Sequence, residues 1–171
     1  MCHIVKWMGA HKVKQSIRCY KVVIKAYDKE DGKYSYHPVF YSSHTLSYEV
    51  GTTYKTEKPA RPRGYNMVVN RGLHSFRTDV CGWIGTARWL DLELEGDTSF
   101  SDWNNVKAEA AVLECEIPKG SWYFEGEANC IFGGHDEAGY VSDTLVVLRE
   151  IPRKEWPSMT FDEYAKRRAY Q

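Results

Sequence analysis

The clearest pattern in the chain is a series of short segments in which apolar side chains alternate with polar ones or run together as β-branched and aromatic residues. Both patterns are typical of strands. Residues 17–27 (IRCYKVVIKAY) predict a core strand, and the Asp-Gly pair that ends residues 28–32 predicts the turn of a hairpin. Residues 34–41 predict its partner strand. Residues 140–151 predict a further strand, which Pro152 ends.

A strand followed by a helix is predicted over residues 71–90. Gly72 permits a tight turn because it has no Cβ, and residues 73–76 then alternate apolar and polar side chains. The Thr-Asp pair at 78–79 supplies suitable N-caps for a helix that continues to the end of the segment. A strand that carries His74 and leads directly into a capped helix commonly lines a ligand cleft. We therefore expect a cleft beside this segment.

The remaining segments predict loops and shorter elements. Residues 55–63 and 91–105 are polar and rich in turn-forming residues, and residues 125–139 hold four glycines, so all three predict loops. Residues 108–117 fit a strand, and their first part also fits the end of a helix. Strands outnumber helices and follow no repeated strand–helix–strand order. This predicts an α+β fold with a mixed, mostly antiparallel sheet and a few short helices.

The length of the chain predicts a single domain. A chain of 171 residues can bury a substantial core without disulfides or metals. We expect residues 1–171 to form one domain, with its core at about residues 17–151 and a helical tail at residues 158–171. The capping-box pattern of Thr160 and Glu163 marks the start of the tail helix.

Composition and charge narrow the function classes. Lys and Arg number 23 and so do Asp and Glu, so the chain lacks the basic excess of a generic nucleic-acid binder. The five cysteines have no metal-type spacing, which predicts reduced thiols and no metal site. No phosphate-binding glycine loop occurs, and no cofactor is expected. The absence of a G-x-S-x-G motif argues against a serine nucleophile. Without a signal peptide or a run of 18 apolar residues, the sequence predicts a cytoplasmic protein with no membrane partner.

Four segments follow one another in an order that is characteristic of a known family. They are residues 48–54 (YEVGTTY), 71–76 (RGLHSF) with the helix after it, 112–120 (VLECEIPKG) and 140–147 (YVSDTLVV). Over about residues 18–151, this succession resembles a domain family of bacteriophage and prophage proteins, which in turn resembles the ADP-ribosyltransferase fold. The resemblance implies an ADP-ribosyltransferase-like architecture and a nucleotide-like ligand.

The chain also departs from the pattern of active transferases of that fold. Those enzymes place a Glu just before the late strand, where this chain has Ser142 and Asp143, with Glu137 further upstream. Arg18 can imitate the Arg of their early strand, although an Arg at the start of a strand is also typical of a solvated edge. The resemblance is therefore compatible with a scaffold that binds its ligand without transfer chemistry.

Six residues are predicted to contact the ligand: Tyr48, Tyr54, His74, Phe76, Ser142 and Asp143. The two tyrosines stand six positions apart on a predicted strand and hence share a face, which suits base stacking and also core packing. The histidine suits a ligand contact and also a structural hydrogen bond to a backbone carbonyl.

Three functions follow as hypotheses. The first is a cytoplasmic phage-type domain that binds an NAD-derived or cyclic nucleotide beside residues 71–90 and so sequesters a defence signal of the host. The second is an ADP-ribosyltransferase or NAD glycohydrolase, in which Asp143 or Glu137 would supply the carboxylate that the ribose requires. The third is an inhibitor that binds a host protein through exposed aromatic side chains, because Tyr and Trp are favoured at interfaces.

Overall fold

The computed structural model describes residues 3–5, 9–29, 32–39, 47–60, 68–69, 71–77, 80–95, 107–129 and 136–158. The strands are β1 (His3–Val5), β2 (His11–Lys12), β3 (Ile17–Tyr27), β4 (Tyr34–Pro38), β5 (Thr53–Lys55), β6 (Val68–Val69), β7 (Leu73–Phe76), β8 (Lys107–Ile117), β9 (Trp122–Asn129), β10 (Asp136–Ser142) and β11 (Thr144–Glu150). The helical elements are the α-helix α1 (Val80–Glu95) and the 3₁₀ turn η2 (Arg153–Glu155). The predicted N-caps at 78–79 and the capping box of the tail lie outside the described residues.

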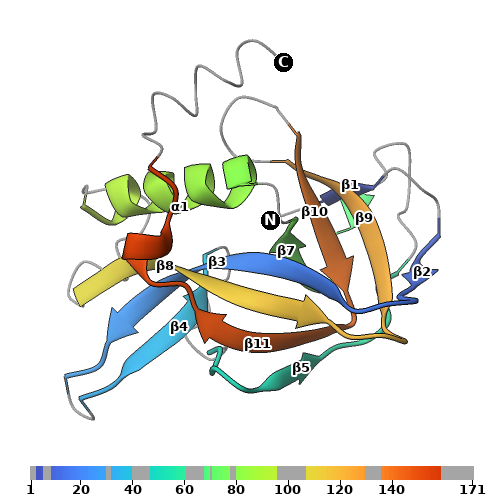
Figure 1. Ribbon diagram of the computed structural model, residues 1–171, viewed down its shortest axis with the longest axis horizontal. Helices are drawn as coiled ribbons and strands as arrows, with labels where there is room; N and C mark the ends of the chain where they lie inside the picture. The colour runs from blue at the N-terminus through green and yellow to red at the C-terminus, as the bar shows by residue number, and fades with distance from the viewer. Residues whose placement is uncertain are drawn as a thin grey trace.

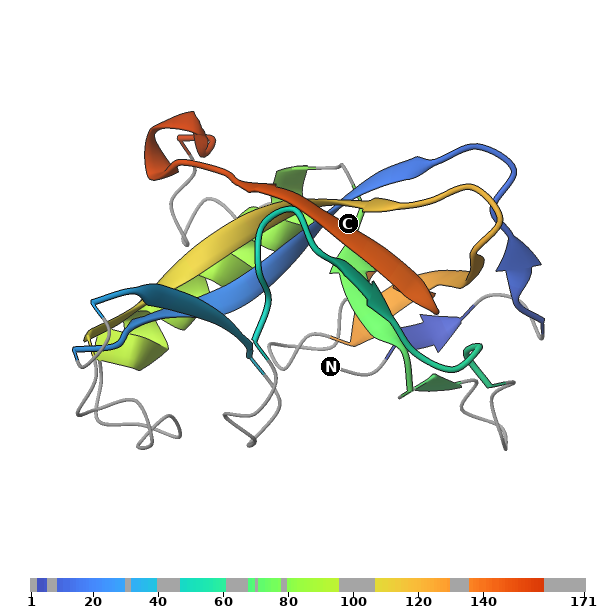
Figure 2. The same cartoon turned by 90° about the horizontal axis from the view of Figure 1, so that it is seen from below.

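The strands build one sheet, and every strand pair in the described part of the chain is antiparallel. The strand order is β5-β11-β8-β3-β7-β10-β9-β1-β6, with β2 paired to β9 and β4 paired to β3. The sheet curls into a half-barrel, and α1 crosses one of its faces over β3 and β8 (Figures 1 and 2). The prediction of an α+β fold with a mixed sheet and several short helices is therefore wrong. The described fold is a curled antiparallel sheet that carries a single α-helix.

Strands β9 and β10 include glycines that were predicted to lie in a loop. Residues 125–139 are predicted to be a loop, but β9 continues to Asn129 and β10 begins at Asp136. Gly126 and Gly139 stand opposite each other in the β9–β10 pairing. Glycine within a strand commonly marks a bend or a close approach of backbone. These glycines therefore lie within the curled sheet and do not end its strands.

The single strand that residues 140–151 predict is divided at Asp143. The part before it, β10, pairs with β7 and β9, whereas the part after it, β11, pairs with β8 and β5. A continuous apolar pattern does not reveal this division, because both parts are half-buried strands with the same periodicity.

The predicted hairpin after β3 is confirmed. The backbone N–H of Asp28 donates to the carbonyl of Lys33 at 2.9 Å, and Gly32 has a φ of 69°, which glycine adopts without strain. Strand β3 then pairs along its whole length with β8, from the pair Ile17–Ile117 to the pair Tyr27–Lys107. Residues 108–117 are thus a strand throughout.

Helix α1 covers one face of β3 and β8 and continues to Glu95, beyond the predicted end at residue 90. Its buried side chains and the sheet residues beneath them form the helix-side cluster: Val22, Ile24, Val39, Phe76, Trp83, Ile84, Ala87, Trp89, Leu90, Ala110, Val112, Ile151 and Trp156. In its last turns, Asp91 accepts hydrogen bonds from Arg153 and from the backbone N–H of Ala110, although the sequence there resembles an acidic loop. The described helices lack the length and apolar character needed to cross a membrane.

The opposite face of the sheet is enclosed by residues 47–55. The backbone N–H of Tyr48 donates to the carbonyl of Tyr36 in β4 at 2.7 Å, and that of Gly51 donates to the carbonyl of Val147 in β11 at 2.8 Å. Residues 47–55 therefore connect β4 to β11 and complete a ring with β3 and β8. Inside this enclosure lies the inner cluster: Val13, Cys19, Val23, Tyr48, Ala111, Leu113, Cys115, Ile117, Leu145 and Val147.

Candidate functional site

Lys21 is the most unusual residue of the enclosure. With 9% of its surface exposed, it is the one Lys, Arg, Asp or Glu that is buried among the residues the structure describes. Its Nζ donates to the carbonyl oxygen of His74 at 2.7 Å and lies 5.0 Å from the centroid of the Tyr48 ring. No carboxylate of the described chain pairs with it. A buried ammonium without a counter-charge is costly, because burial removes its hydration.

A buried hydroxyl lies beside this ammonium. The pairing of Tyr20 with Phe76 places Ser75 of β7 next to Lys21 on the neighbouring strand, and alternation turns both side chains toward the enclosure. Ser75 is 1% exposed and lies next to the Cys19 thiol. Its Oγ otherwise has no hydrogen-bond partner in the described residues. Ser75 and Lys21 thus both retain unused hydrogen-bonding capacity inside an apolar space.

Two free thiols also lie inside the enclosure, in the inner cluster. Cys19 and Cys115 stand opposite each other on β3 and β8, and both are fully buried. Burial raises the pKa of the Cys19 thiol to about 11, an effect that Ser75 and Lys21 partly offset. Burial also raises the pKa of the Cys115 thiol. Both thiols therefore remain protonated at neutral pH, so neither acts as a reactive thiolate.

Next to the enclosure, at the hairpin end of β3, lies a cavity of about 580 Å³, which we call the tyrosine hollow. Its lining consists of Asp28, Lys33, Tyr34, Ser35, Tyr36, Ser47, Tyr48, Glu49 and Val50. Tyr34 and Val50 are 46% and 48% exposed. The Glu49 carboxylate has no hydrogen-bond or ion-pair partner in the described chain. The hollow therefore combines aromatic surface with an available carboxylate.

Beside the hollow lies a fully paired polar group. Lys25 donates from Nζ to both carboxylate oxygens of Glu150, at 2.9 and 3.0 Å, and the Tyr36 hydroxyl donates to Glu150 at 2.6 Å. Burial and then the hydrogen bond to this carboxylate raise the pKa of the Tyr36 hydroxyl above its usual range. Tyr36 therefore remains a neutral hydrogen-bond donor on the wall of the hollow.

Two of the six predicted site residues, Tyr48 and His74, contact Lys21, and a third, Tyr54, packs against Tyr48. Tyr48 is 3% exposed and packs edge-on against Tyr54, with 4.9 Å between the ring centroids. The hydroxyl of Tyr54 accepts a hydrogen bond from the backbone N–H of Glu49 at 2.7 Å. His74 contributes its carbonyl oxygen to Lys21. Of these three residues, Tyr48 also lines the tyrosine hollow.

The other three predicted residues lie elsewhere. Phe76 is 2% exposed and belongs to the helix-side cluster. The fully buried Ser142 donates to the carbonyl of Thr144 at 2.9 Å. One oxygen of Asp143 accepts hydrogen bonds from the backbone N–H of Trp122 and from the hydroxyl of Thr144, at 3.1 and 3.0 Å. Ser142 and Asp143 therefore hold the bend between β10 and β11, away from the hollow.

Sequence reasoning missed Lys21, although one signal was present. Within the strand IRCYKVVIKAY, Lys21 occupies the same face as Cys19 and Val23. A lysine at an inward position of a strongly apolar strand is unexpected, since lysine is almost never fully buried unless it is paired. The ring that buries Lys21 could not be read from the sequence, because residues 47–55 close it through backbone hydrogen bonds.

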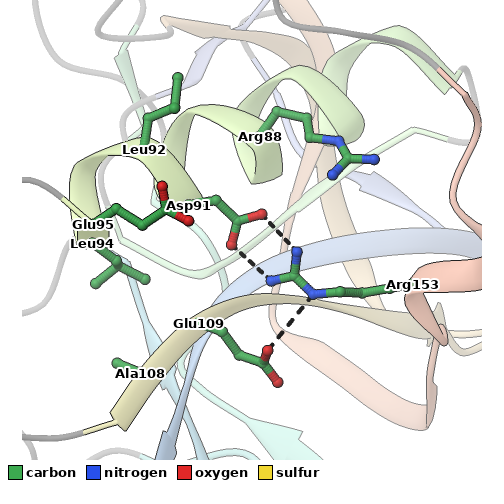
Figure 3. A pocket seen from close by; sticks show the side chains of 8 residues that line it. All are labelled: Arg88, Asp91, Leu92, Leu94, Glu95, Ala108, Glu109 and Arg153. Carbon is green, nitrogen blue, oxygen red and sulfur yellow. Dashed lines mark hydrogen bonds and ion pairs between the residues drawn. The ribbon is translucent and has the colours of Figure 1, made fainter.

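A second cavity, of about 600 Å³, lies between the end of α1 and the start of β8 (Figure 3). Its central cation, Arg153, donates to both oxygens of Asp91 at 2.8 and 2.7 Å and to the carbonyl of Ala110 at 2.9 Å. Glu109 lies 3.7 Å from the same guanidinium. Arg153 therefore spans this cavity, and its hydrogen bonds connect η2 to α1 and β8.

Metal chemistry has no visible basis in the described ranges, where no three His, Cys, Asp or Glu side chains gather closely enough to hold an ion. The arrangement that remains is an enclosure with an aromatic mouth and an unmatched cation in its depth. Comparisons with protein-family models, with curated proteins and with solved structures found no match to this chain.

Proposed function

We propose that this protein binds a nucleotide-like ligand whose nucleoside end occupies the tyrosine hollow. The observation that carries the proposal is the concentration of exposed apolar surface at this place. Tyr34 and Val50, two of the three large hydrophobic residues that are exposed in the described chain, both line the hollow. Exposed apolar groups that gather at a concave surface commonly mark a ligand site.

The lining chemistry suits a nucleoside. A tyrosine ring offers a stacking surface to any base, and base–aromatic stacking contributes about 1–3 kcal/mol. The carboxylate of Glu49, which has no partner among the described residues, is the type of group that accepts hydrogen bonds from ribose hydroxyls. A volume of about 580 Å³ is within the usual range for small-molecule sites.

The position of Asp143 favours the sequestration hypothesis over the transferase hypothesis. Asp143, one of the two carboxylates considered for transfer chemistry, is engaged by Trp122 and Thr144 at the β10–β11 bend and does not line the hollow. We propose that the ligand is held and released unchanged. The phage resemblance implies a protein that sequesters a nucleotide signal, and such a protein requires only reversible binding of its ligand.

Calorimetric titration with adenosine, AMP, ADP-ribose, NAD and cyclic nucleotides tests the proposal. We expect at least one of them to bind, and chromatography of the denatured complex should recover it intact. Tyr34→Ala should weaken binding about tenfold through lost stacking. Leu92→Ala is the matched control, because Leu92 is 54% exposed and lies outside the hollow. Absence of binding at millimolar concentration, or equal losses in both variants, would overturn the proposal.

A further inference from the structure

We propose that Lys21 and Ser75 form an anion subsite behind Tyr48 that takes one phosphate or carboxylate group. Lys21 carries three N–H donors, and the described chain supplies a single acceptor, the carbonyl of His74. Ser75 lies on the neighbouring strand with a hydroxyl that makes no normal hydrogen bond in the described residues. An oxyanion accepts from both groups and supplies the missing counter-charge.

The position of Tyr48 connects this subsite to the tyrosine hollow. The residue lines the hollow, and its ring also lies 5.0 Å from the Lys21 ammonium. Under this proposal, a ligand that occupies the hollow extends past the Tyr48 ring to Lys21. In this respect the inference rests on the proposed function, because it assigns the anionic group of the same ligand to the depth of the enclosure.

The charges of the enclosure limit the ligand to one anionic group. Lys25, the nearest other lysine on this face of β3, is already neutralised by both oxygens of Glu150. A diphosphate or triphosphate would place further negative charge in the enclosure without a matching cation, which burial makes costly. The subsite therefore selects a nucleoside monophosphate or a cyclic monophosphate over polyphosphates.

Calorimetry with adenosine, AMP and ATP separates the anion subsite from the hollow. We expect AMP to bind the wild-type protein at least tenfold more tightly than adenosine and more tightly than ATP. Lys21→Met should abolish the difference between AMP and adenosine, and Ser75→Ala should reduce it. Lys12→Met is the control, because Lys12 is exposed on β2. Equal affinity of the wild-type protein for AMP and adenosine, or an unchanged ratio in Lys21→Met, overturns the inference.

Inorganic phosphate and acetate distinguish this inference from the proposed function and identify the source of the anion. At constant ionic strength set with chloride, phosphate or acetate should slow the acetylation of Lys21 by an amine reagent, as followed by mass spectrometry, and leave Lys12 unaffected. This measurement uses the wild-type protein and does not depend on the folding of a variant. If anions protect Lys21 but adenosine never binds, the subsite stands and the nucleoside proposal fails. If adenosine binds but no anion protects Lys21, the opposite holds.

Discussion

Lys21 and Lys25 project from the same face of β3 into the same enclosure, yet their surroundings differ. At the mouth, Lys25 meets both oxygens of Glu150, which also accepts a hydrogen bond from Tyr36. In the depth, Lys21 meets one carbonyl oxygen and the face of an aromatic ring. Most buried polar groups in folded proteins have their partners within the chain. The difference is therefore that the described residues satisfy the ammonium at the mouth, whereas in the depth they leave part of the hydrogen-bonding capacity of Lys21 unused.

The largest expected effect tests whether the Cys19 thiol is shielded from water in the depth of the enclosure. Burial raises the pKa of the Cys19 thiol from 9.0 to about 11, so the folded state holds this proton more tightly than the unfolded state does. Stability is therefore present below pH 9 and is lost as the pH rises toward 11. This single group should account for a loss of about 2–3 kcal/mol. Urea unfolding at pH 8 to 11 measures it.

Cys19→Ala provides the control for this alkaline loss. The variant starts from a lower stability because a buried side chain is shortened, but its stability should fall less steeply between pH 9 and 11 than that of the wild-type protein. Parallel curves for the two proteins would show that the thiol ionises normally and that the depth is hydrated.

The next effect concerns the paired lysine at the mouth. Glu150→Leu removes the hydrogen-bond acceptor of Lys25 and Tyr36, and we expect a loss of about 2 kcal/mol, because a partly buried pair is broken and Lys25 keeps only a 3.7 Å contact with Glu109. Unfolding in urea at neutral pH measures this loss. The double variant Lys25→Met with Glu150→Leu should recover part of it, since no charge then remains unpaired. A double variant less stable than the single one would contradict the pairing.

Parts of the fold that depend on local sequence patterns were predictable, whereas parts that depend on distant pairing were not. The pattern of strand β3 and the Asp-Gly turn correctly predicted the hairpin, because local alternation and turn chemistry decide both. The division of the strand at Asp143 was missed, as were the parts of β9 and β10 at residues 125–129 and 136–139, since pairing partners distant in the chain decide them.

The residues around Lys21 could be predicted only in part, because segments distant in the chain bring them together. Of the residues selected from the sequence, Tyr48 and the backbone carbonyl of His74 contact Lys21, and Tyr54 packs against Tyr48, but Lys21 itself was not selected. Lys21 becomes exceptional only when the ring of β3, β4, β8, β11 and residues 47–55 closes over it. No local pattern encodes that closure.

A smaller effect is expected outside the enclosure, at the end of α1, where a paired cation serves as a reference. Asp91→Asn weakens the two hydrogen bonds from Arg153 and should cost about 1 kcal/mol, because the Arg153 side chain is 41% exposed and solvent screens the pair. The cost should shrink in 1 M NaCl. A loss that does not depend on salt would show that the carboxylate acts through helix geometry and not through its charge.

The smallest effect, and the one opposite in direction, is expected for Lys21→Met in phosphate-free buffer. The substitution gives up one hydrogen bond to the His74 carbonyl, which contributes about 0.5–1.5 kcal/mol. It also removes a buried charge that lacks a counter-ion, and this change alone favours the folded state. The two terms nearly cancel, so stability should stay within about 1 kcal/mol of the wild-type protein or rise slightly. Urea unfolding of both proteins, without and with added phosphate, provides the measurement. Phosphate should stabilise the wild-type protein alone, because the variant keeps the fold and loses the cation. A loss of several kcal/mol in Lys21→Met without phosphate would instead make Lys21 a structural residue like Lys25 and remove the contrast between the two ends of the enclosure.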